Sequence, residues 1–295
     1  MGCFMRILSL NGGGCRGYMS AVILSKIEEE TGKNISDLFD IVAGVSTGSI
    51  IAACIGKGLS ASMVAKLYKE LSQKIFKSKS WLPWTAWYSA DKLEEVVKDI
   101  LEYQFNTSKT KIMISAAEID GPDVLKPKFW KSWQETDSIK ANDIVVASCS
   151  APIYFAPKVM GKKVFIDGGF VANNPSMCGI VEAMKLGVDK ENICNLNINC
   201  GEQKGFDKAQ KLSSIYKWIP NISGLITLAV NTGERSVAYQ SQQLIGTRHI
   251  EVGPSIDLPL DTLEFDIMDR EAHRIWIQNK DAILALIRNT KKEQV

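Results

Sequence analysis

Histidine is scarce in this chain of 295 residues, which contains only His249 and His273. A hydrolytic triad of serine, histidine and an acidic residue would therefore have only two candidates for its base. Neither histidine lies near a cluster of cysteines, so a zinc site would lack the usual ligand spacing. We expect no structural metal and no cofactor.

Paired cysteine motifs are also missing. The cysteines are odd in number, most lie in apolar stretches and no two form a CxxC pair; the seven are Cys3, Cys15, Cys54, Cys149, Cys178, Cys194 and Cys200. This pattern predicts reduced thiols in the core rather than a disulfide framework.

An excess of either charge is absent as well. The 35 basic and 33 acidic residues leave a formal net charge of +2, which argues against a surface built for nucleic acid. Hydrophobic residues make up 45% of the chain and charged residues 23%. This composition predicts a globular protein with a sizeable core.

No long hydrophobic run is present in the C-terminal half. Its longest apolar stretch, 222–230, contains Ser223, Gly224 and Thr227 and is shorter than the ~20 residues of a membrane span. A strand is expected from about residue 5, which leaves no room for a secretion signal. We therefore expect a cytoplasmic protein that contacts membranes only from their surface.

The hydrophobic pattern predicts an α/β fold. A β-prone run at 4–10 leads into a glycine loop, a helical pattern covers 18–30, and a second strand at 39–45 is followed by a buried helix. Strands connected in this way by helices pair in parallel. We expect a central, mostly parallel sheet sandwiched by helices.

The same pattern continues to about residue 200. It predicts strands at 111–116, 163–166 and 193–199, and helices at 91–101, 138–148 and 175–186. Residues 201–261 mix polar loop with moderately apolar segments, and 270–287 predicts a closing amphipathic helix. Because no repeat or linker is visible, we expect one domain over residues 1–295.

The first chemical motif is Gly44-Val45-Ser46-Thr47-Gly48, which matches Gly-x-Ser-x-Gly. In this motif a sharp strand-to-helix turn exposes the serine hydroxyl above a sheet, and the glycines Gly44 and Gly48 relieve crowding. The expected strand before Ser46 and helix after it provide the required context. The pattern predicts a nucleophile elbow.

The second motif, Gly12-Gly13-Gly14-Cys15-Arg16-Gly17, lies between the first strand and the first helix. Backbone N–H groups of Gly12, Gly13, Gly14 and Cys15 can bind an anion there, and Arg16 either adds positive charge or holds the loop. The residues also match the Gly-x-Gly-x-x-Gly nucleotide fingerprint. That interpretation requires an acidic residue at the end of the second strand, whereas Asp40 lies at its start.

The third motif is Asp167-Gly168-Gly169, which follows the short strand at 163–166. The aspartate projects from a strand end, and Asn174-Pro175 then begins a helix. Asp-Gly is also ordinary turn chemistry, so this motif gains its meaning from the other two.

Together the three motifs resemble the patatin-like phospholipase family in order and in context, over roughly residues 5–185. The stretch 147–155 also resembles the segment that precedes the aspartate in that family. The resemblance implies a phospholipase A-type lipid acyl hydrolase. It implies that Ser46 is the nucleophile and Asp167 its base, that Gly12 to Arg16 stabilise the oxyanion, and that no histidine is needed.

Chemistry adds an expectation about the base. An aspartate with an ordinary pKa of about 3.9 is a weak base toward a serine hydroxyl, so we expect Asp167 to be partly buried with a raised pKa. The cycle would pass through an acyl-serine intermediate.

Two groups of aromatic residues mixed with lysines suit a lipid interface. One is 81–88, just after Lys74, Lys77 and Lys79; the other is 126–133. The alternative for both groups is that the rings pack as a lid or core wall around an apolar pocket. The basic residues Arg288, Lys291 and Lys292 would favour anionic lipid. Membrane phospholipid is the expected partner.

Two alternatives remain open at this point. One is an α/β-hydrolase whose triad adds His249 or His273 to Ser46 and Asp167, although its glycine-rich loop would follow a later strand. The other is a nucleotide-binding regulatory module with an idle serine. Some bacterial proteins that resemble patatin are activated by cyclic nucleotides in antiviral defence, so a small-molecule activator is a further hypothesis.

Overall fold

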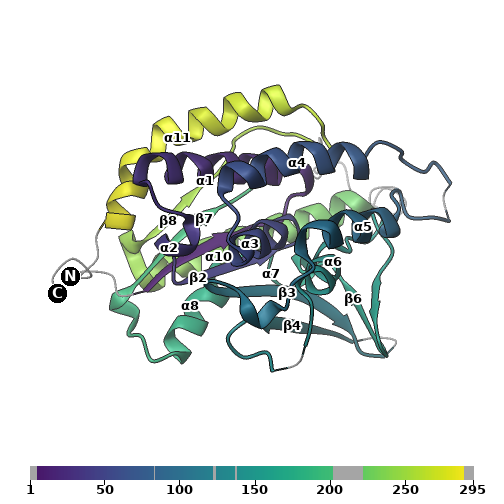
Figure 1. Cartoon of the computed structure of the whole chain (residues 1–295), viewed down its shortest axis with the longest axis horizontal. Helices are drawn as coiled ribbons and strands as arrows, with labels where there is room; N and C mark the ends of the chain where they lie inside the picture. The colour runs from purple at the N-terminus through teal and green to yellow at the C-terminus, as the bar shows by residue number, and fades with distance from the viewer. Residues whose placement is uncertain (1–4, 83, 122–123, 137, 202–221, 289–295) are drawn as a thin grey trace, which may run out of the picture.

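An eight-stranded sheet forms the centre of the molecule. The computed structural model describes residues 5–82, 84–121, 124–136, 138–201 and 222–288 (Figure 1). Seven strands follow the order β5-β6-β3-β2-β1-β7-β8, and β4 pairs with β3. The strands are β1 Met5–Leu10, β2 Ile41–Val45, β3 Lys111–Ile119, β4 Leu125–Lys131, β5 Lys158–Met160, β6 Lys163–Ile166, β7 Ile193–Ile198 and β8 His249–Val252.

The pairing is parallel in the centre and antiparallel on one side. Strands β3, β2, β1, β7 and β8 run parallel to one another. Strands β4, β5 and β6 form antiparallel pairs beside β3. The expected α/β fold with a mostly parallel sheet is confirmed.

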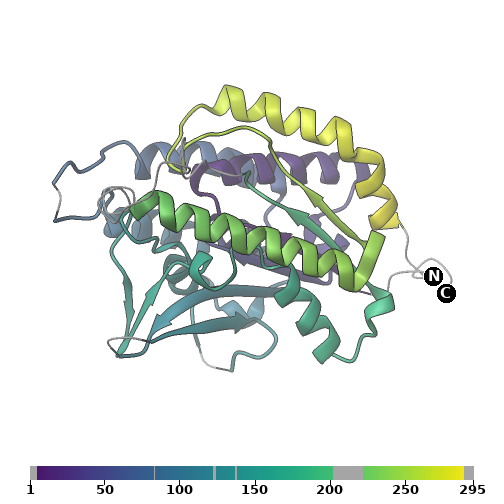
Figure 2. The ribbon, with the colours of Figure 1, turned by 180° about the vertical axis from the view of Figure 1, so that it is seen from behind.

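Helices cover both faces of the sheet. They are α1 Gly17–Thr31, α2 Ile35–Leu38, α3 Thr47–Lys57, α4 Ala61–Ile75, α5 Ala90–Leu101, α6 Ala141–Cys149, α7 Gly169–Ala172, α8 Ser176–Lys185, α10 Ile222–Ile245 and α11 Phe265–Arg288. The larger core includes side chains of α1, α3, α4, α5, α6 and α11. A smaller core joins α8 and α10 to the opposite face, where α10 crosses the sheet (Figure 2).

Burial explains why the first two strands are nearly continuous apolar runs. Every residue of β2 is buried, and β1 is buried after Met5. Central strands of parallel sheets are covered on both faces, so they do not alternate between apolar and polar residues. Helix α1 ends where Gly32 adopts a left-handed φ of 67°, as Thr31-Gly32 predicts.

The sequence of 201–261, a mixture of polar loop and moderately apolar segments, did not indicate the regular elements that its described part contains. Residues 222–245 form the helix α10, and 249–252 form the strand β8. Helix α10 contains Gly224 and Gly233 and buries only Ser241 and Ile245 among its described side chains. Its apolar spacing, at 222, 225, 226, 229 and 230, is broken by Gly233 and Glu234 and resumes only at 237, 244 and 245, which obscures a single long helix in the sequence. Residues 202–221 lie outside the described residues.

Other differences are smaller. Helix α4 and strands β4 and β5 were not expected, and α11 begins five residues earlier than the predicted 270. Among the cysteines, five are free, but Cys194 takes part in a disulfide, so the prediction of reduced thiols is wrong for this residue. The chain contains no CxxC pair, and spacing in sequence does not reveal pairs that only the fold brings together.

Candidate active site

Ser46 lies at a sharp turn between β2 and α3. Its backbone adopts φ 51° and ψ −123°, a conformation that is rare for a residue with a side chain. A Cβ at Gly44 would lie 2.3 Å from the Gly48 carbonyl oxygen, and one at Gly48 would lie 2.2 Å from the carbonyl oxygen of Leu10. The two glycines therefore permit the close approach of strand and helix that the elbow requires.

Asp167 contacts Ser46 directly. Ser46 Oγ donates a hydrogen bond of 2.7 Å to Asp167 Oδ2, and the backbone N–H of Gly169 donates one of 2.7 Å to Oδ1. Asp167 is only 5% exposed. Burial raises its pKa from the ordinary 3.8 to about 6, against the opposite effect of these two hydrogen bonds. The expected burial and raised pKa of Asp167 are confirmed.

Strand register explains how Asp167 reaches Ser46. Val45, at the end of β2, is paired with Ser115, and β3 continues four residues further to Ile119. Strand β6 runs back antiparallel along this extension, with Ile166 opposite Ala117. The next residue, Asp167, thus returns to the level of Ser46.

The end of α6 and the residues after it hold both members of the dyad. Ser148 Oγ accepts a hydrogen bond of 2.9 Å from the Ser46 N–H, and Cys149 Sγ donates to the Ser46 carbonyl oxygen at 3.1 Å. The carbonyl oxygen of Ser150 accepts from the Asp167 N–H at 3.0 Å. These contacts give a structural reason for the stretch 147–155 that the sequence analysis singled out.

The glycine loop lies beside the dyad, because a Cβ at Gly12 would be 3.1 Å from Ser46 Cβ. Of the N–H groups of Gly12 to Cys15, two are used within the protein. That of Gly12 donates to the carbonyl oxygen of Asn173 at 3.3 Å, and that of Cys15 donates to Leu260 at 2.7 Å.

The N–H groups of Gly13 and Gly14 differ from these two. Neither has a hydrogen-bond partner in the part of the chain that the structure describes. Thr47 Oγ1, one residue after the serine, donates to the carbonyl oxygen of Gly14 at 2.7 Å and thus joins the loop to the elbow. Among the described residues, the loop therefore leaves the N–H groups of Gly13 and Gly14 available on the cavity that Ser46 also lines.

Arg16 is buried, at 4% exposure, and its Nε donates to the carbonyl oxygen of Gly13 at 3.1 Å. Burial lowers its pKa, against the opposite effect of Glu234, Tyr154 and Asp257. The guanidinium lines the cavity described below and also holds the glycine loop. Both roles considered for Arg16 are thus compatible with its position.

The dyad opens into a cavity of about 350 Å³. Its polar part contains Arg16, Asn173 and Glu234, and Asn173 Nδ2 donates to the Glu234 carboxylate. Most of the wall is apolar and comes from α3, α4, α5, the segment 151–155 and α10. The apolar residues of α4 and α5 that line it are Leu71, Ile75, Leu93, Val96, Val97, Ile100 and Leu101. Such a cavity suits a ligand with a long hydrocarbon part.

The two histidines do not take part in the site. His249 is buried on β8 with its Nδ1 3.0 Å from Nδ2 of Asn195, and His273 is exposed on α11. Asp40 accepts a hydrogen bond from the backbone N–H of Arg6 at the opposite end of β1 from the glycine loop. The triad and the dinucleotide interpretations therefore lack the residues they need.

The aromatic groups have different environments. In the first, Trp81 and Trp84 are 87% and 78% exposed, whereas Trp87 lines the cavity. In the second, Trp130 is buried against Phe165, with ring centroids 5.1 Å apart. Trp130 therefore packs in the core, as the alternative interpretation of this group expected, whereas Phe129 and Trp133 are half-buried and Lys126 is exposed. Arg288 is exposed at the end of α11, and Lys291 and Lys292 lie outside the described residues.

Two further features concern metal binding and membrane spans. No group of three or more histidine, cysteine, aspartate or glutamate side chains within the described ranges is arranged to hold a metal ion. Among the same residues, no helix is both long enough and apolar enough to cross a bilayer.

These features, Ser46 hydrogen-bonded to Asp167 on an elbow beside a glycine loop, form an arrangement typical of serine acyl hydrolases. A model of the family described as patatin-like phospholipase matches residues 8–177, and the chain belongs to this family. A cGAMP-activated phospholipase of Escherichia coli is 32% identical over 61% of this chain and 56% of its own length. A cUMP-AMP-activated phospholipase of Escherichia coli is 29% identical over 77% of this chain and 74% of its length.

More distant relatives extend the match. The calcium-independent phospholipase A2-gamma of Mus musculus is 25% identical over 90% of this chain and 37% of its own length. The chain thus spans only part of each relative. The crystal structure of VipD from Legionella pneumophila shares the fold, with a TM-score of 0.52 and 13% identity over 97% of this chain and 67% of VipD.

Proposed function

We propose that this protein hydrolyses fatty-acyl esters of phospholipids through an acyl-serine intermediate. The observation that carries the proposal is the 2.7 Å hydrogen bond from Ser46 Oγ to a buried Asp167 at the wall of a mostly apolar cavity. A fatty-acyl chain fits the apolar wall. The names of the relatives support an ester of a phospholipid as the substrate.

The first half of the reaction forms the acyl-serine. Asp167 accepts the hydroxyl proton as Ser46 Oγ attacks the ester carbonyl carbon, and the N–H groups of Gly13 and Gly14 stabilise the oxyanion. The carbon–oxygen bond to the lysophospholipid then breaks, and Asp167 returns the proton to the leaving oxygen. A base with a pKa of about 6 suits both transfers, because it is ionised at pH 7 and still a workable acid when protonated.

The second half releases the fatty acid. Water attacks the acyl carbon while Asp167 accepts one of its protons, and the proton then passes to Ser46 Oγ as the acyl bond breaks. The dyad is thereby restored without a histidine.

The test is fatty-acid release from mixed phospholipid vesicles by the wild type, Ser46→Ala and Asp167→Asn. We expect the wild type to release fatty acid and both variants to lose it by at least about 10³-fold, as nucleophile and base variants of serine hydrolases do. The exposed Ser62 offers a matched serine control, and Ser62→Ala should keep full activity. Equal activity of wild type and Ser46→Ala would contradict the proposal.

We also propose that the loop between α4 and α5 docks the protein on the membrane surface. This loop presents the exposed Trp81 and Trp84 next to the exposed Lys77 and Lys79, and both flanking helices line the cavity. Indole rings and lysines are favoured at the headgroup boundary of a bilayer.

Vesicle binding tests this contact. Replacing Trp81 and Trp84 together by alanine should weaken binding to anionic vesicles by about tenfold or more and leave hydrolysis of a soluble short-chain ester unchanged. Tyr239, 66% exposed on α10, provides a matched aromatic control whose alanine variant should bind normally. Unchanged binding of the double variant would refute the proposed docking loop.

Activation by a cyclic dinucleotide is a second proposal, supported by the names of two relatives. Fatty-acid release should rise severalfold when cGAMP or cUMP-AMP is added to the wild type and should stay absent in Ser46→Ala with either nucleotide. Release that is high and unaffected by both nucleotides would argue against it.

A further inference from the structure

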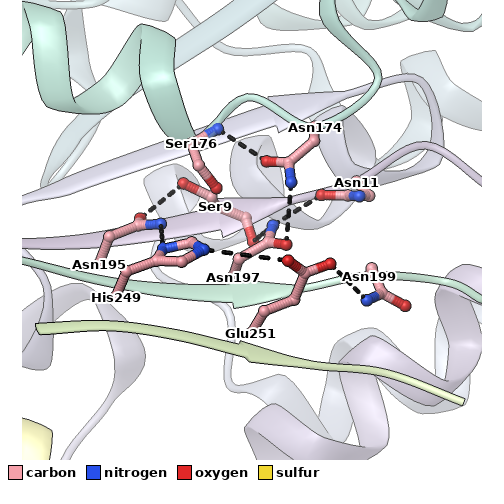
Figure 3. Close-up of polar contacts among 9 residues, drawn as sticks. All are labelled: Ser9, Asn11, Asn174, Ser176, Asn195, Asn197, Asn199, His249 and Glu251. Atoms are coloured by element: carbon pink, nitrogen blue, oxygen red, sulfur yellow. Dashed lines mark hydrogen bonds and ion pairs between the residues drawn. The ribbon is translucent and has the colours of Figure 1, made fainter. Parts of the chain in front are cut away.

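A layer of polar side chains lies on the face of the sheet against which α8 and α10 pack, and Figure 3 shows its polar contacts. It is formed by residues of β1, β7 and β8 that share one face, together with the residues that precede and begin α8. Its buried members are Ser9, Asn11, Asn174, Ser176, Asn195, Asn197 and His249. Buried amides in central strands are unusual, and they persist where their hydrogen bonds fix a particular arrangement.

Asn197 is the junction of this layer. Its Nδ2 donates to Asn11 Oδ1 at 2.6 Å and to the carbonyl oxygen of Ser9 at 3.2 Å. Its Oδ1 accepts from Asn174 Nδ2 at 3.3 Å. The side chain is fully buried and makes all three bonds within the protein.

The partners of Asn197 belong to the two loops that flank the dyad. Asn11 directly precedes the glycine loop, and its backbone N–H donates to the carbonyl oxygen of Ile198 at 3.2 Å. Asn174 directly follows Asn173, whose carbonyl oxygen accepts the hydrogen bond from the Gly12 N–H at 3.3 Å. Asn197 therefore connects the glycine loop to the loop after α7, the short helix that follows Asp167.

We propose that Asn197 is a positioning residue that holds the glycine loop at the distance from Ser46 and Asp167 needed to bind the oxyanion. The inference rests on the proposed function, because an oxyanion forms only if Ser46 attacks an ester. Asn197 itself does not line the cavity, so it would act through the glycine loop. Donors to an oxyanion act only when they are held in place before the charge develops, so a displaced loop lowers kcat more than substrate affinity.

Asn195 provides a matched control. It lies two residues earlier on the same face of β7 and is also fully buried. Its amide bonds to Ser9 Oγ at 2.7 Å and to His249 Nδ1 at 3.0 Å, and neither residue lines the cavity. If an Asn197 variant loses activity only because the fold is destabilised, the matching Asn195 variant should lose as much activity. If Asn197 positions the glycine loop, only the Asn197 variant should lose activity.

The experiment compares Asn197→Leu with Asn195→Leu, two substitutions that each replace a buried amide by an apolar side chain with the same number of heavy atoms. We measure Tm, kcat and KM for a soluble short-chain ester, and the rate at which a fluorophosphonate labels Ser46. In the labelling step Ser46 Oγ bonds to phosphorus, fluoride leaves and Asp167 takes the hydroxyl proton. The phosphoryl oxygen then occupies the position of the oxyanion.

We expect Asn197→Leu to lower kcat and the labelling rate by about 10- to 100-fold with KM within about twofold, as loss of a supporting residue does. Asn195→Leu should lower Tm by a similar amount and keep kcat within about twofold. If Asn197→Leu does not fold, Asn197→Ser, which keeps one donor, should show the same pattern at smaller magnitude. Equal losses of kcat in the Asn195 and Asn197 variants would overturn the inference.

The labelling rate separates this inference from the proposed function. A wild type that is labelled at Ser46 but hydrolyses no lipid would contradict the phospholipase proposal, while the ratio of labelling rates between the Asn197 and Asn195 variants still decides the positioning role. A wild type that is not labelled at Ser46 would overturn both.

Discussion

Lowering the pH from 7 to 5 should reduce kcat/KM about tenfold, because the base of the dyad takes up a proton. The pKa of Asp167 is raised to about 6 by burial. Each pH unit changes the ratio of ionised to protonated carboxyl tenfold, so about 91% of Asp167 is ionised at pH 7 and about 9% at pH 5. An aspartate at its ordinary 3.8 would still be about 94% ionised at pH 5.

The same proton affects stability in the direction opposite to that of a salt-bridged carboxylate. Since the pKa of Asp167 is higher in the folded protein than in the unfolded chain, the folded state binds the proton more tightly. Its contribution to stability is fully present below about pH 4 and is lost as the pH rises through about 6. The difference between the two pKa values corresponds to about 3 kcal/mol.

Asp167→Asn should therefore be inactive but more stable than the wild type at pH 8. The amide can accept from the Gly169 N–H and donate to Ser46 Oγ, so it keeps both contacts without a buried charge. We expect a gain of up to about 3 kcal/mol at pH 8, and a much smaller gain at pH 4, where the wild-type carboxyl is already protonated.

The assay measures kcat/KM for a soluble ester from pH 4 to 8 at constant ionic strength, with Ser46→Ala as the blank. Thermal unfolding of the wild type, Asp167→Asn and Ser46→Ala is followed at each pH. Two results would refute the conclusion that burial raises the pKa of Asp167. One is a kcat/KM that stays constant down to pH 5, and the other is an Asp167→Asn variant that is less stable than the wild type at pH 8.

Three further predictions concern backbone, cavity and helix. Ser46→Gly should be more stable than Ser46→Ala by on the order of 1 kcal/mol in denaturant unfolding, because only glycine tolerates φ 51° and ψ −123° without strain. Val97→Phe, which fills part of the cavity wall, should lower kcat/KM for long-chain relative to short-chain esters by about tenfold, and equal effects on both would contradict an acyl site there. Backbone amides of α10 should exchange with solvent faster than those of α1, because α1 buries nine of its residues; equal protection would contradict this comparison.

The geometry of the motif around Ser46 could be predicted from sequence because its signal is local. Gly44 and Gly48 are required by contacts with carbonyl oxygens within or next to the elbow, so their spacing around Ser46 directly reflects its geometry. The burial of Asp167 was expected from its chemistry, although not from its neighbours in sequence. Its hydrogen-bond partners Ser46 and Ser150 lie on the elbow and directly after α6, so only the fold brings them to Asp167.

Supporting residues carried weaker signals. Ser148 and Cys149 fall within the stretch 147–155 that the sequence analysis noted, but nothing in the stretch indicated contacts with Ser46. Asn195 and Asn197 in β7, and Asn199 just after it, lie at alternate positions, and alternation normally predicts a strand with one face in water. Here both faces are covered, so polar residues at alternate positions of a buried strand were the signal for the polar layer of Figure 3.

Trp130 of the second aromatic group shows why the contact between Ser46 and Asp167, which lie 121 residues apart in the sequence, depends on core packing. A slip of β6 by one residue would move Asp167 by about 3.3 Å, too far to bond Ser46, and would turn each β6 side chain to the other face of the sheet. Phe165 is buried against Trp130 on β4, so such a slip would remove it from the core. Trp130, one ring of the group that suited lipid, thus helps to fix the register that places Asp167 beside Ser46.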